Sequence, residues 1–240
     1  MSDTAIVTGG TRGIGAAVSV ALSEDGHEVA ATYAGNDEAA EAFKTQTGIS
    51  VYRFDVADFD QCADNVSRIE TDLGPVGILV NNAGITRDGT LHRMDFEQWN
   101  AVLQTNPSSC YNMCRNVIDG MRERGFGRIV NIGSLNGQAG QYGQVNYAAA
   151  KFGIHGFTKA LALEGAAKGV TVNAIAPGYV DTDMVRAVPE KVLEKIIATI
   201  PVGRLGYASD IARAVQFLVA DDTTFIAGSS LSINGGQHMY

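Results

Sequence analysis

The chain has 240 residues, of which 45% are hydrophobic and 18% charged, and only five are prolines. This composition supports one folded domain with a buried core and excludes a disordered chain. The 18 basic and 26 acidic residues give a formal net charge of -8, so the overall field repels nucleic acid and anionic lipid, and neither is an expected partner.

Short apolar or β-branched runs alternate with helical patterns along the whole chain. Helices are expected at 13–25 and 37–46, between the first three strands. The expected strands are residues 4–8, 28–33, 50–54, 77–81, 128–132, 170–176 and 230–234. This alternation predicts an α/β fold, a doubly wound parallel sheet of about seven strands with helices on both faces.

No linker, charge block or internal repeat divides the sequence, so residues 1–240 are expected to form a single domain. The alternation lapses at 182–206, where a helical insertion follows the end of a strand. Ligands of open α/β sheets bind at the carboxyl edge of the strands. We therefore expect this insertion to be a small substrate lid, with a plain surface excursion as the alternative.

The cysteines and the termini indicate a cytoplasmic protein. Cys62, Cys110 and Cys114 are an odd number without metal-ligand spacing, which favours reduced thiols and no metal site. The N-terminal residues run directly into a strand without a basic segment, and no apolar run reaches the ~18 residues of a membrane span.

A glycine-rich turn joins the first strand to the first helix. Such glycines allow a tight turn and let backbone N–H groups approach a pyrophosphate at the helix N-terminus. A purely structural turn is the alternative for an isolated motif, but here strand, turn and helix are all present. The residues expected to contact a dinucleotide are Gly9, Thr11, Arg12, Gly13, Ile14 and Gly15.

The end of the second strand predicts which dinucleotide binds. Sites for NAD place an acid there to hold the ribose 2′-hydroxyl, but this sequence has Tyr33. With no carboxylate at that position and with Arg12 available as a charge-assisted partner, the sequence favours NADPH/NADP+. A solvated Arg12 without a ligand is the alternative.

Two further strand ends carry residues suited to the cofactor. Asp55 and Val56 follow the third strand, and Asp55 can accept a hydrogen bond from an adenine amino group. Asn82, Ala83 and Gly84 follow the fourth strand, where small residues let the backbone pass beside a ribose. As alternatives, Asp55 forms a turn or helix cap, and the asparagines brace neighbouring strands.

Tyr147 and Lys151 are four residues apart in a helical pattern, so their side chains share one helix face. A nearby ammonium group favours a phenolate and brings proton transfer by tyrosine into range. A carbonyl that accepts hydride needs a proton donor and a second hydrogen bond. Tyr147 would supply the proton, and Ser134, which follows the fifth strand, would supply the bond. Tyr147 and Lys151 are also expected to contact the cofactor, Lys151 at its ribose.

These motifs together resemble the short-chain dehydrogenase/reductase family: Thr8-Gly9-x-x-x-Gly13-x-Gly15, Asn81-Asn82-Ala83-Gly84, Ser134 and Tyr147-x-x-x-Lys151. The resemblance spans nearly the whole chain. It implies a seven-stranded Rossmann-type sheet, a nicotinamide cofactor and commonly a homotetramer. It also implies that the Asn106 carbonyl holds a water in a relay to Lys151. Pro107 departs from the family pattern, because proline can kink a helix and a kink there would move that carbonyl. A local bend that the helix tolerates is the alternative.

Polar residues near the catalytic pair are expected to converge on the ligands. Pro177 and Gly178 follow the sixth strand and are expected to contact the cofactor. The candidate substrate residues, whose amides and phenols suit a second carbonyl beside the reacting ketone, are Gln141, Tyr142, Gln144 and Tyr179. Ordinary polar surface loops are the alternative.

Four segments also resemble a group within the family, the acetoacetyl-CoA reductases of polyhydroxyalkanoate synthesis: residues 134–138, 140–144, 187–189 and 200–206. The resemblance implies reduction of an acyl-CoA thioester, acetoacetyl-CoA, to (R)-3-hydroxybutyryl-CoA by NADPH. One alternative is 3-oxoacyl-acyl-carrier-protein reductase of fatty acid synthesis, which shares the catalytic motifs. An alternative of another class is a non-catalytic NADP-binding regulatory protein.

Overall fold

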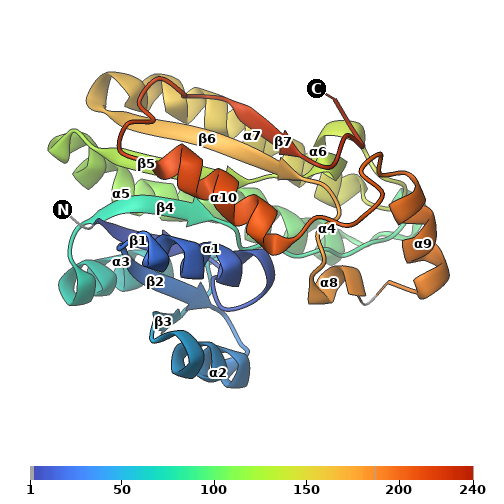
Figure 1. Cartoon of the computed structure of the whole chain (residues 1–240), viewed down its shortest axis with the longest axis horizontal. Coiled ribbons are helices and arrows are strands. Elements are labelled where there is room, and N and C mark those ends of the chain that lie inside the picture. Colours follow the sequence, from blue (N-terminus) through green and yellow to red (C-terminus); the bar gives the residue numbers. More distant parts are fainter. Residues whose placement is uncertain (1–2, 187, 240) are drawn as a thin grey trace.

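Seven parallel strands form one sheet in the computed structural model, which describes residues 3–186 and 188–239 (Figure 1). In chain order they are β1 (Thr4–Val7), β2 (Glu28–Tyr33), β3 (Ser50–Arg53), β4 (Val76–Asn81), β5 (Gly127–Ile132), β6 (Val170–Pro177) and β7 (Ser230–Ile233). The expected fold class is confirmed, and the strand limits agree with the sequence to within one residue.

The sheet order β3-β2-β1-β4-β5-β6-β7 shows where the chain reverses direction across the sheet. It grows outward from β1 to β3 and then crosses back to place β4 on the other side of β1. Such a reversal opens a crevice at the carboxyl ends of the two central strands. The turns that follow β1 and β4 border that crevice.

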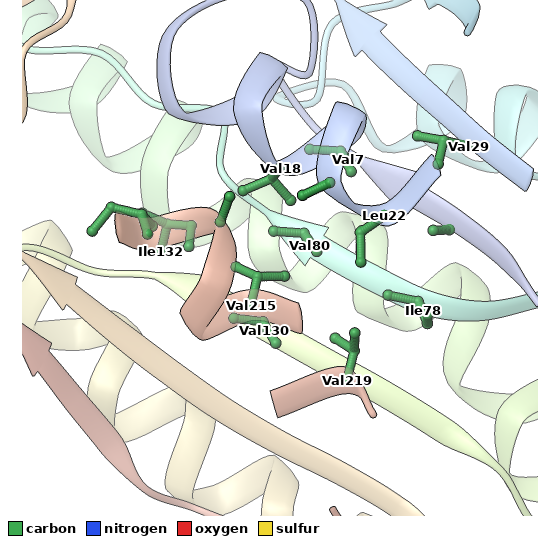
Figure 2. Packing of buried hydrophobic residues seen from close by; sticks show 14 of the residues in the cluster. Val7, Val18, Leu22, Val29, Ile78, Val80, Val130, Ile132, Val215 and Val219 are labelled. Atoms are coloured by element: carbon green, nitrogen blue, oxygen red, sulfur yellow. The ribbon is translucent and has the colours of Figure 1, made fainter. Parts of the chain in front are cut away.

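Helices cover both faces of the sheet, and for this reason all residues of β1, β4, β5 and β6 are buried. On one face lie α1 (Gly13–Glu24) and α10 (Ala208–Val219), with α2 (Asp37–Thr47) near the β3 edge. Figure 2 shows Val18 and Leu22 of α1 and Val215 and Val219 of α10 packed over Val80 of β4.

The opposite face carries α3 (Phe59–Leu73), α5 (Ser109–Arg124) and α7 (Val145–Gly165). In α5, Met113, Val117 and Met121 recur at four-residue spacing and are at most 2% exposed. This spacing puts them on one helix face, which packs against the sheet. α7 is the longest described helix, and it runs beside β6 from the carboxyl edge of the sheet.

The remaining helices gather at the end toward which the strand arrows point (Figure 1). They are α4 (Phe96–Leu103), α6 (Leu135–Ala139), α8 (Asp183–Arg186) and α9 (Glu190–Ala198). Two 3₁₀ turns (Leu91–Arg93, Ala166–Lys168) and a π-helical turn (Gln104–Ser108) complete the order. In the ranges described, none of the helices is long and apolar enough to cross a membrane.

Candidate active site

Three positions of the turn after β1 require glycine, two because of the backbone conformation and one because a side chain has no room. Gly9 has a φ of +61° and Gly13 a φ of +54°, a backbone conformation that other residues rarely adopt. A Cβ on Gly15 would overlap the carbonyl oxygen of Gly9. Thr11 is buried, whereas Arg12 is exposed at the N-cap of α1. The turn therefore presents backbone and one exposed guanidinium at the start of a helix.

Thr8 connects this turn to the segment after β4. Its hydroxyl accepts hydrogen bonds from the backbone N–H groups of Asn82 (2.9 Å) and Ala83 (3.0 Å). The Asn82 side chain donates in return to the carbonyls of Thr8 (2.9 Å) and Gly9 (3.3 Å). These bonds fix the two sides of the central crevice relative to each other. Asn82 thus braces neighbouring strand ends, the structural role that the sequence left open.

Asp55 also has a local structural role. Its carboxylate accepts from the backbone N–H of Ala57 at 2.9 Å, which makes the turn after β3. The side chain is exposed, while Val56 is buried. The Val56 carbonyl accepts a hydrogen bond from the side-chain amide of Asn112 at 2.9 Å, which ties the turn to α5. An adenine contact of Asp55 stays a prediction.

Ser134 and Tyr147 meet beside α6. Ser134 is the N-cap residue of α6, and its hydroxyl accepts from the Asn136 backbone N–H at 3.1 Å. Burial raises the pKa of Tyr147, a hydrogen bond with Ser134 opposes that rise, and Asp88 and Tyr179 add to it. The expectation that Lys151 brings the pKa of Tyr147 down is not met in this structure, because desolvation of the phenol dominates.

Lys151 lies one turn beyond Tyr147 on α7 and is 4% exposed. Its Nζ donates to the Ile132 carbonyl at 2.7 Å and lies 5.8 Å from the centroid of the Tyr147 ring. Burial lowers the pKa of Lys151 to about 8, and the nearby Cys110 thiol acts weakly in the other direction. The amine therefore titrates near neutral pH instead of remaining a permanent cation.

Asn106 is completely buried and sits in the π-helical turn between α4 and α5. Its side-chain amide makes two 3.0 Å hydrogen bonds with the backbone of Ile85. Its own carbonyl accepts from the Ser109 hydroxyl at 2.9 Å. Pro107 has no N–H for the regular ladder, so the helix widens at this point, as the sequence anticipated for a local bend.

The side chains of Asn106 and Lys151 both lie next to Gly84. A Cβ at Gly84 would overlap Asn106 Oδ1 and would lie 3.4 Å from Lys151 Nζ. The two side chains therefore converge under the segment that follows β4, although they are 45 positions apart in the chain. A water relay through the Asn106 carbonyl remains a prediction.

The side-chain amide of Gln144, which the sequence suggested as a substrate contact, already hydrogen-bonds with two other side chains. Its amide oxygen accepts from the Asn136 side chain at 2.9 Å, and its amide nitrogen donates to Asp88 at 2.8 Å. The Gly89 N–H donates to the Gly143 carbonyl beside it, at 2.8 Å. Asp88 and Asn136 were not among the sequence candidates, because only the fold brings three distant segments together at this amide.

The other candidate substrate residues differ in their surroundings. Tyr179 lies near Tyr147, since its charge contributes to the raised pKa of that phenol. Gln141 is exposed, and Tyr142 is 88% exposed in the same turn. Pro177 is the buried last residue of β6, and the N–H of Gly178 donates to the Ile233 carbonyl at 2.9 Å. The structure thus brings Tyr179 near Tyr147, whereas Tyr142 is exposed.

The 182–206 segment contains α8 and α9 and approaches the glycine-rich turn. A Cβ on Gly13 would lie 3.5 Å from the Thr182 methyl group. Arg186 makes two hydrogen bonds with Asp181, at 2.8 and 3.0 Å, which close the start of the segment onto itself. Val202 binds the carbonyl of Gly235 through its N–H at 3.2 Å. Ala187, part of one of the segments noted in the sequence, lies outside the described residues.

These features fit a dinucleotide. Glycines 9, 13 and 15 leave a side-chain-free approach to the N-terminus of α1, and Gly84 leaves another beside Lys151. Among the described residues, no group of three or more His, Cys, Asp or Glu side chains is arranged to hold a metal ion. The fold, the glycine turn and the Ser134, Tyr147 and Lys151 cluster define a Rossmann-type oxidoreductase that uses a nicotinamide cofactor.

Comparison with known proteins places the chain in a family. Residues 3–193 match the model of the short chain dehydrogenases, and the chain belongs to this family. It is 61% identical over 238 residues to the acetoacetyl-CoA reductase of Shinella zoogloeoides and 62% identical over 239 residues to that of Rhizobium meliloti, and each match covers 99% of both chains. It is 44% identical over 237 residues to the 3-oxoacyl-acyl-carrier-protein reductase of Escherichia coli, covering 98% of this chain and 97% of that one.

Proposed function

We propose that this protein reduces acetoacetyl-CoA to (R)-3-hydroxybutyryl-CoA with NADPH, as a step of polyhydroxybutyrate synthesis. The observation that carries this proposal is the 61–62% identity, over 99% of both chains, to two proteins named acetoacetyl-CoA reductase. The 44% identity to a carrier-protein reductase makes 3-oxoacyl-acyl-carrier-protein reduction the second candidate. The grouping of Ser134, Tyr147 and Lys151 argues against a non-catalytic binding protein.

Tyr147 is the proposed proton donor. When bound beside the glycine-rich turn, a nicotinamide cofactor would supply hydride to the ketone carbon, and the ketone oxygen would then become negatively charged. A phenol whose pKa is raised by burial stays protonated at neutral pH and has a proton to give. Ser134 hydrogen-bonds with Tyr147 and is proposed to donate to the same oxygen.

Lys151 stabilises the charge left on Tyr147. Its ammonium lies 5.8 Å from the phenol ring, and the buried surroundings strengthen the attraction between an ammonium and a phenolate. With a pKa of about 8, Lys151 also exchanges its own proton near neutral pH. Asn106, which lies next to Lys151 under Gly84, is the proposed holder of the water that passes this proton on.

We propose NADPH over NADH on the basis of the end of β2. Tyr33 occupies the position where an acid would hold the ribose 2′-hydroxyl, and the Arg12 guanidinium is exposed at the N-cap of α1. Gly10 ties the turn that carries Arg12 to β2, through a 2.9 Å bond from its N–H to the Thr32 carbonyl. Asp55, Val56, Pro177 and Gly178 are the other proposed contacts of the cofactor.

Placing a carboxylate at the end of β2 is expected to reverse the cofactor preference. Tyr33→Asp should lower kcat/KM for NADPH and raise it for NADH, because the new acid repels a 2′-phosphate and accepts from a 2′-hydroxyl. Each change should be about tenfold, the usual value of one charge-assisted hydrogen bond. The measurement is kcat/KM with both cofactors. Equal use of NADPH and NADH by the unmodified enzyme would show that the 2′-phosphate argument is wrong.

The substrate is proposed to contact the phenol of Tyr179 and the hydrogen-bonded amide of Gln144. Tyr179 is near Tyr147 and is free to donate to the thioester carbonyl of a 3-oxoacyl chain. Gln144 is held by Asp88 and Asn136, so its amide shapes the site and presents the remaining lone pair and proton. Gln141 and Tyr142, which are exposed, are proposed to line the outer part of the site.

Acetoacetyl-CoA is expected to be used more efficiently than a plain methyl ketone such as 2-butanone. A ketone without the thioester leaves polar groups of the site unpaired, at about 1–3 kcal/mol each, or roughly tenfold to a hundredfold in kcat/KM. Tyr179→Phe and Gln144→Ala should lower kcat/KM for acetoacetyl-CoA more than for the ketone. The exposed Tyr111 of α5 gives the control Tyr111→Phe.

The same assay separates the candidate functions. Faster turnover of acetoacetyl-CoA than of acetoacetyl-acyl-carrier-protein supports the CoA thioester as substrate, and the reverse order supports the second candidate. A longer 3-oxoacyl-CoA measures the chain-length limit. If all these substrates were reduced with equal efficiency, or if neither variant lost selectivity, the assignment of Gln144 and Tyr179 would be refuted while the family would stand.

Two more proposals concern the whole molecule. We propose that residues 182–206 form a substrate lid, because Thr182 lies next to the glycine-rich turn.

We also propose a homotetramer. Apolar side chains are exposed on two different helices, Leu163 of α7 (84%) and Phe217 of α10 (55%), and a tetramer with two kinds of interface would cover both.

A further inference from the structure

The carboxyl ends of β2 and β3 bring a second arginine to the place where the adenosine ribose is expected. Tyr33 and Arg53 are direct partners in the parallel pair of β2 and β3. Paired residues of neighbouring strands lie on the same face of a sheet. Nothing in the sequence connects Arg53 with Tyr33, since they are 20 positions apart; the strand register makes them neighbours.

Arg53 is held there by two weak contacts. Its Nε donates to the Ala34 carbonyl at 3.3 Å, and its Nη1 lies 3.1 Å from Asp37 Oδ2. The side chains of Arg53 and Asp37 are 59% and 60% exposed. Exposed ion pairs of this kind contribute about 0–1 kcal/mol, so a stronger anion can displace the carboxylate.

Asp37 puts a carboxylate at the end of β2 that the sequence argument did not consider. It is the first residue of α2, and it forms a hydrogen bond with the Tyr33 side chain. An unpaired carboxylate at this point would repel a 2′-phosphate. Arg53 offsets that charge in the absence of a ligand, and Asp37 competes with a phosphate for the Arg53 guanidinium.

We propose that Arg53 is a second binding residue for the 2′-phosphate of NADPH, opposite Arg12, and that Asp37 holds Arg53 until the phosphate takes its place. This inference rests on the proposed preference for NADPH. A phosphate dianion carries more charge than a carboxylate and accepts the planar guanidinium fork in two parallel hydrogen bonds. Among the described residues, the guanidinium of Arg12 has no hydrogen bond or ion pair, and that of Arg53 has only the two weak contacts.

The test measures binding without catalysis. The purified enzyme and its variants are titrated by calorimetry with 2′,5′-ADP, which carries the 2′-phosphate, and with 5′-AMP, which lacks it. Arg53→Gln should weaken binding of 2′,5′-ADP about tenfold or more and leave 5′-AMP within about twofold. Arg53→Lys should fall between the parent and Arg53→Gln, because it keeps the charge and loses the fork.

Asp37→Asn gives the opposite expected result. It keeps a hydrogen-bond acceptor for Tyr33 but removes the charge that competes for Arg53, so 2′,5′-ADP should bind about threefold more tightly. The matched control is Arg68→Gln, which removes the same charge from another exposed pair, Arg68 and Asp72 at 3.6 Å on α3. This control should change neither titration.

The outcomes separate this inference from the proposal on which it rests. If the parent binds 2′,5′-ADP no better than 5′-AMP, the preference for NADPH fails, and the role of Arg53 fails with it. If the parent prefers 2′,5′-ADP but Arg53→Gln keeps that preference, only Arg53 is excluded. An equal loss for both nucleotides would show that Arg53 supports the fold of this edge and does not bind the phosphate.

Discussion

Tyr147→Phe is expected to lower kcat by about a hundredfold or more while leaving cofactor affinity nearly unchanged. The substitution removes the hydroxyl that gives the proton but keeps the ring that packs at the start of α7. Loss of a general acid typically costs about 10²–10⁴ in rate. The pKa of Tyr147 is raised by burial, so the parent keeps the phenol proton at neutral pH. The first loss of activity on raising the pH is expected near pH 8, where Lys151 loses its ammonium charge.

The measurement is kcat and KM for acetoacetyl-CoA, together with cofactor affinity from fluorescence titration. Tyr111→Phe provides the control, since it deletes a hydroxyl from an exposed tyrosine on α5 that takes no part in the proposed chemistry. Turnover of Tyr147→Phe within about threefold of the parent, far less than the loss expected for a general acid, would remove Tyr147 from the mechanism.

Lys151→Met is expected to lower kcat about a hundredfold and to change how stability depends on pH. The loss of rate follows from removing the ammonium that stabilises the Tyr147 phenolate, an effect comparable to losing one oxyanion donor. The stability effect follows from burial. The pKa of Lys151 falls from 10.5 in the unfolded chain to about 8 in the folded protein, so the folded protein resists protonation at this site.

The sign of that effect is set by which state binds the proton. Between pH 8 and pH 10.5 the unfolded chain holds a proton on Lys151 that the folded protein has released, so folding becomes more favourable as pH rises. Relative to Lys151→Met, the parent should gain about 3 kcal/mol in unfolding free energy across this window. Below pH 8 the difference between the two proteins should be constant.

Urea unfolding of both proteins at several pH values between 7 and 10.5 measures this gain. The control is Lys159→Met, which removes an exposed lysine from the same helix and measures the effect on stability of losing a lysine that is not buried. Cys110, whose pKa is influenced by Lys151, does not interfere in this window because burial raises its pKa to about 11. Parallel stability curves for the parent and Lys151→Met would mean that the buried amine is solvated and that its charge is not tuned.

The positions of the strands followed from the sequence because each is a local pattern. A run such as Val76–Asn81 is apolar throughout, since helices cover the sheet on both sides, and this pattern does not depend on which strands are neighbours. The spacing of Tyr147 and Lys151 is equally local, since four residues make about one helical turn. The glycine turn was predictable because only glycine tolerates the conformations of Gly9 and Gly13.

Charges and hydrogen bonds between distant segments depended on the tertiary structure. Burial raises the pKa of Tyr147, the Ser134 hydrogen bond lowers it, and Asp88 and Tyr179 raise it further. None of these effects follows from the spacing of Tyr147 and Lys151. Gln144 looked like a free amide, yet Asp88 and Asn136 both bind it, and they come from segments after β4 and in α6.

The class of fold, the glycine-rich turn and the proposed pair of Tyr147 and Lys151 could be predicted from the sequence, because each depends on a pattern within a few consecutive residues. The tertiary structure decided which polar groups are satisfied, which charges are buried and which strand ends meet. Arg53 is the clearest case, since its relation to Tyr33 exists only through the register of β2 and β3. Such pairings depend on contacts between residues far apart in the chain, and a single sequence carries no local signal for them.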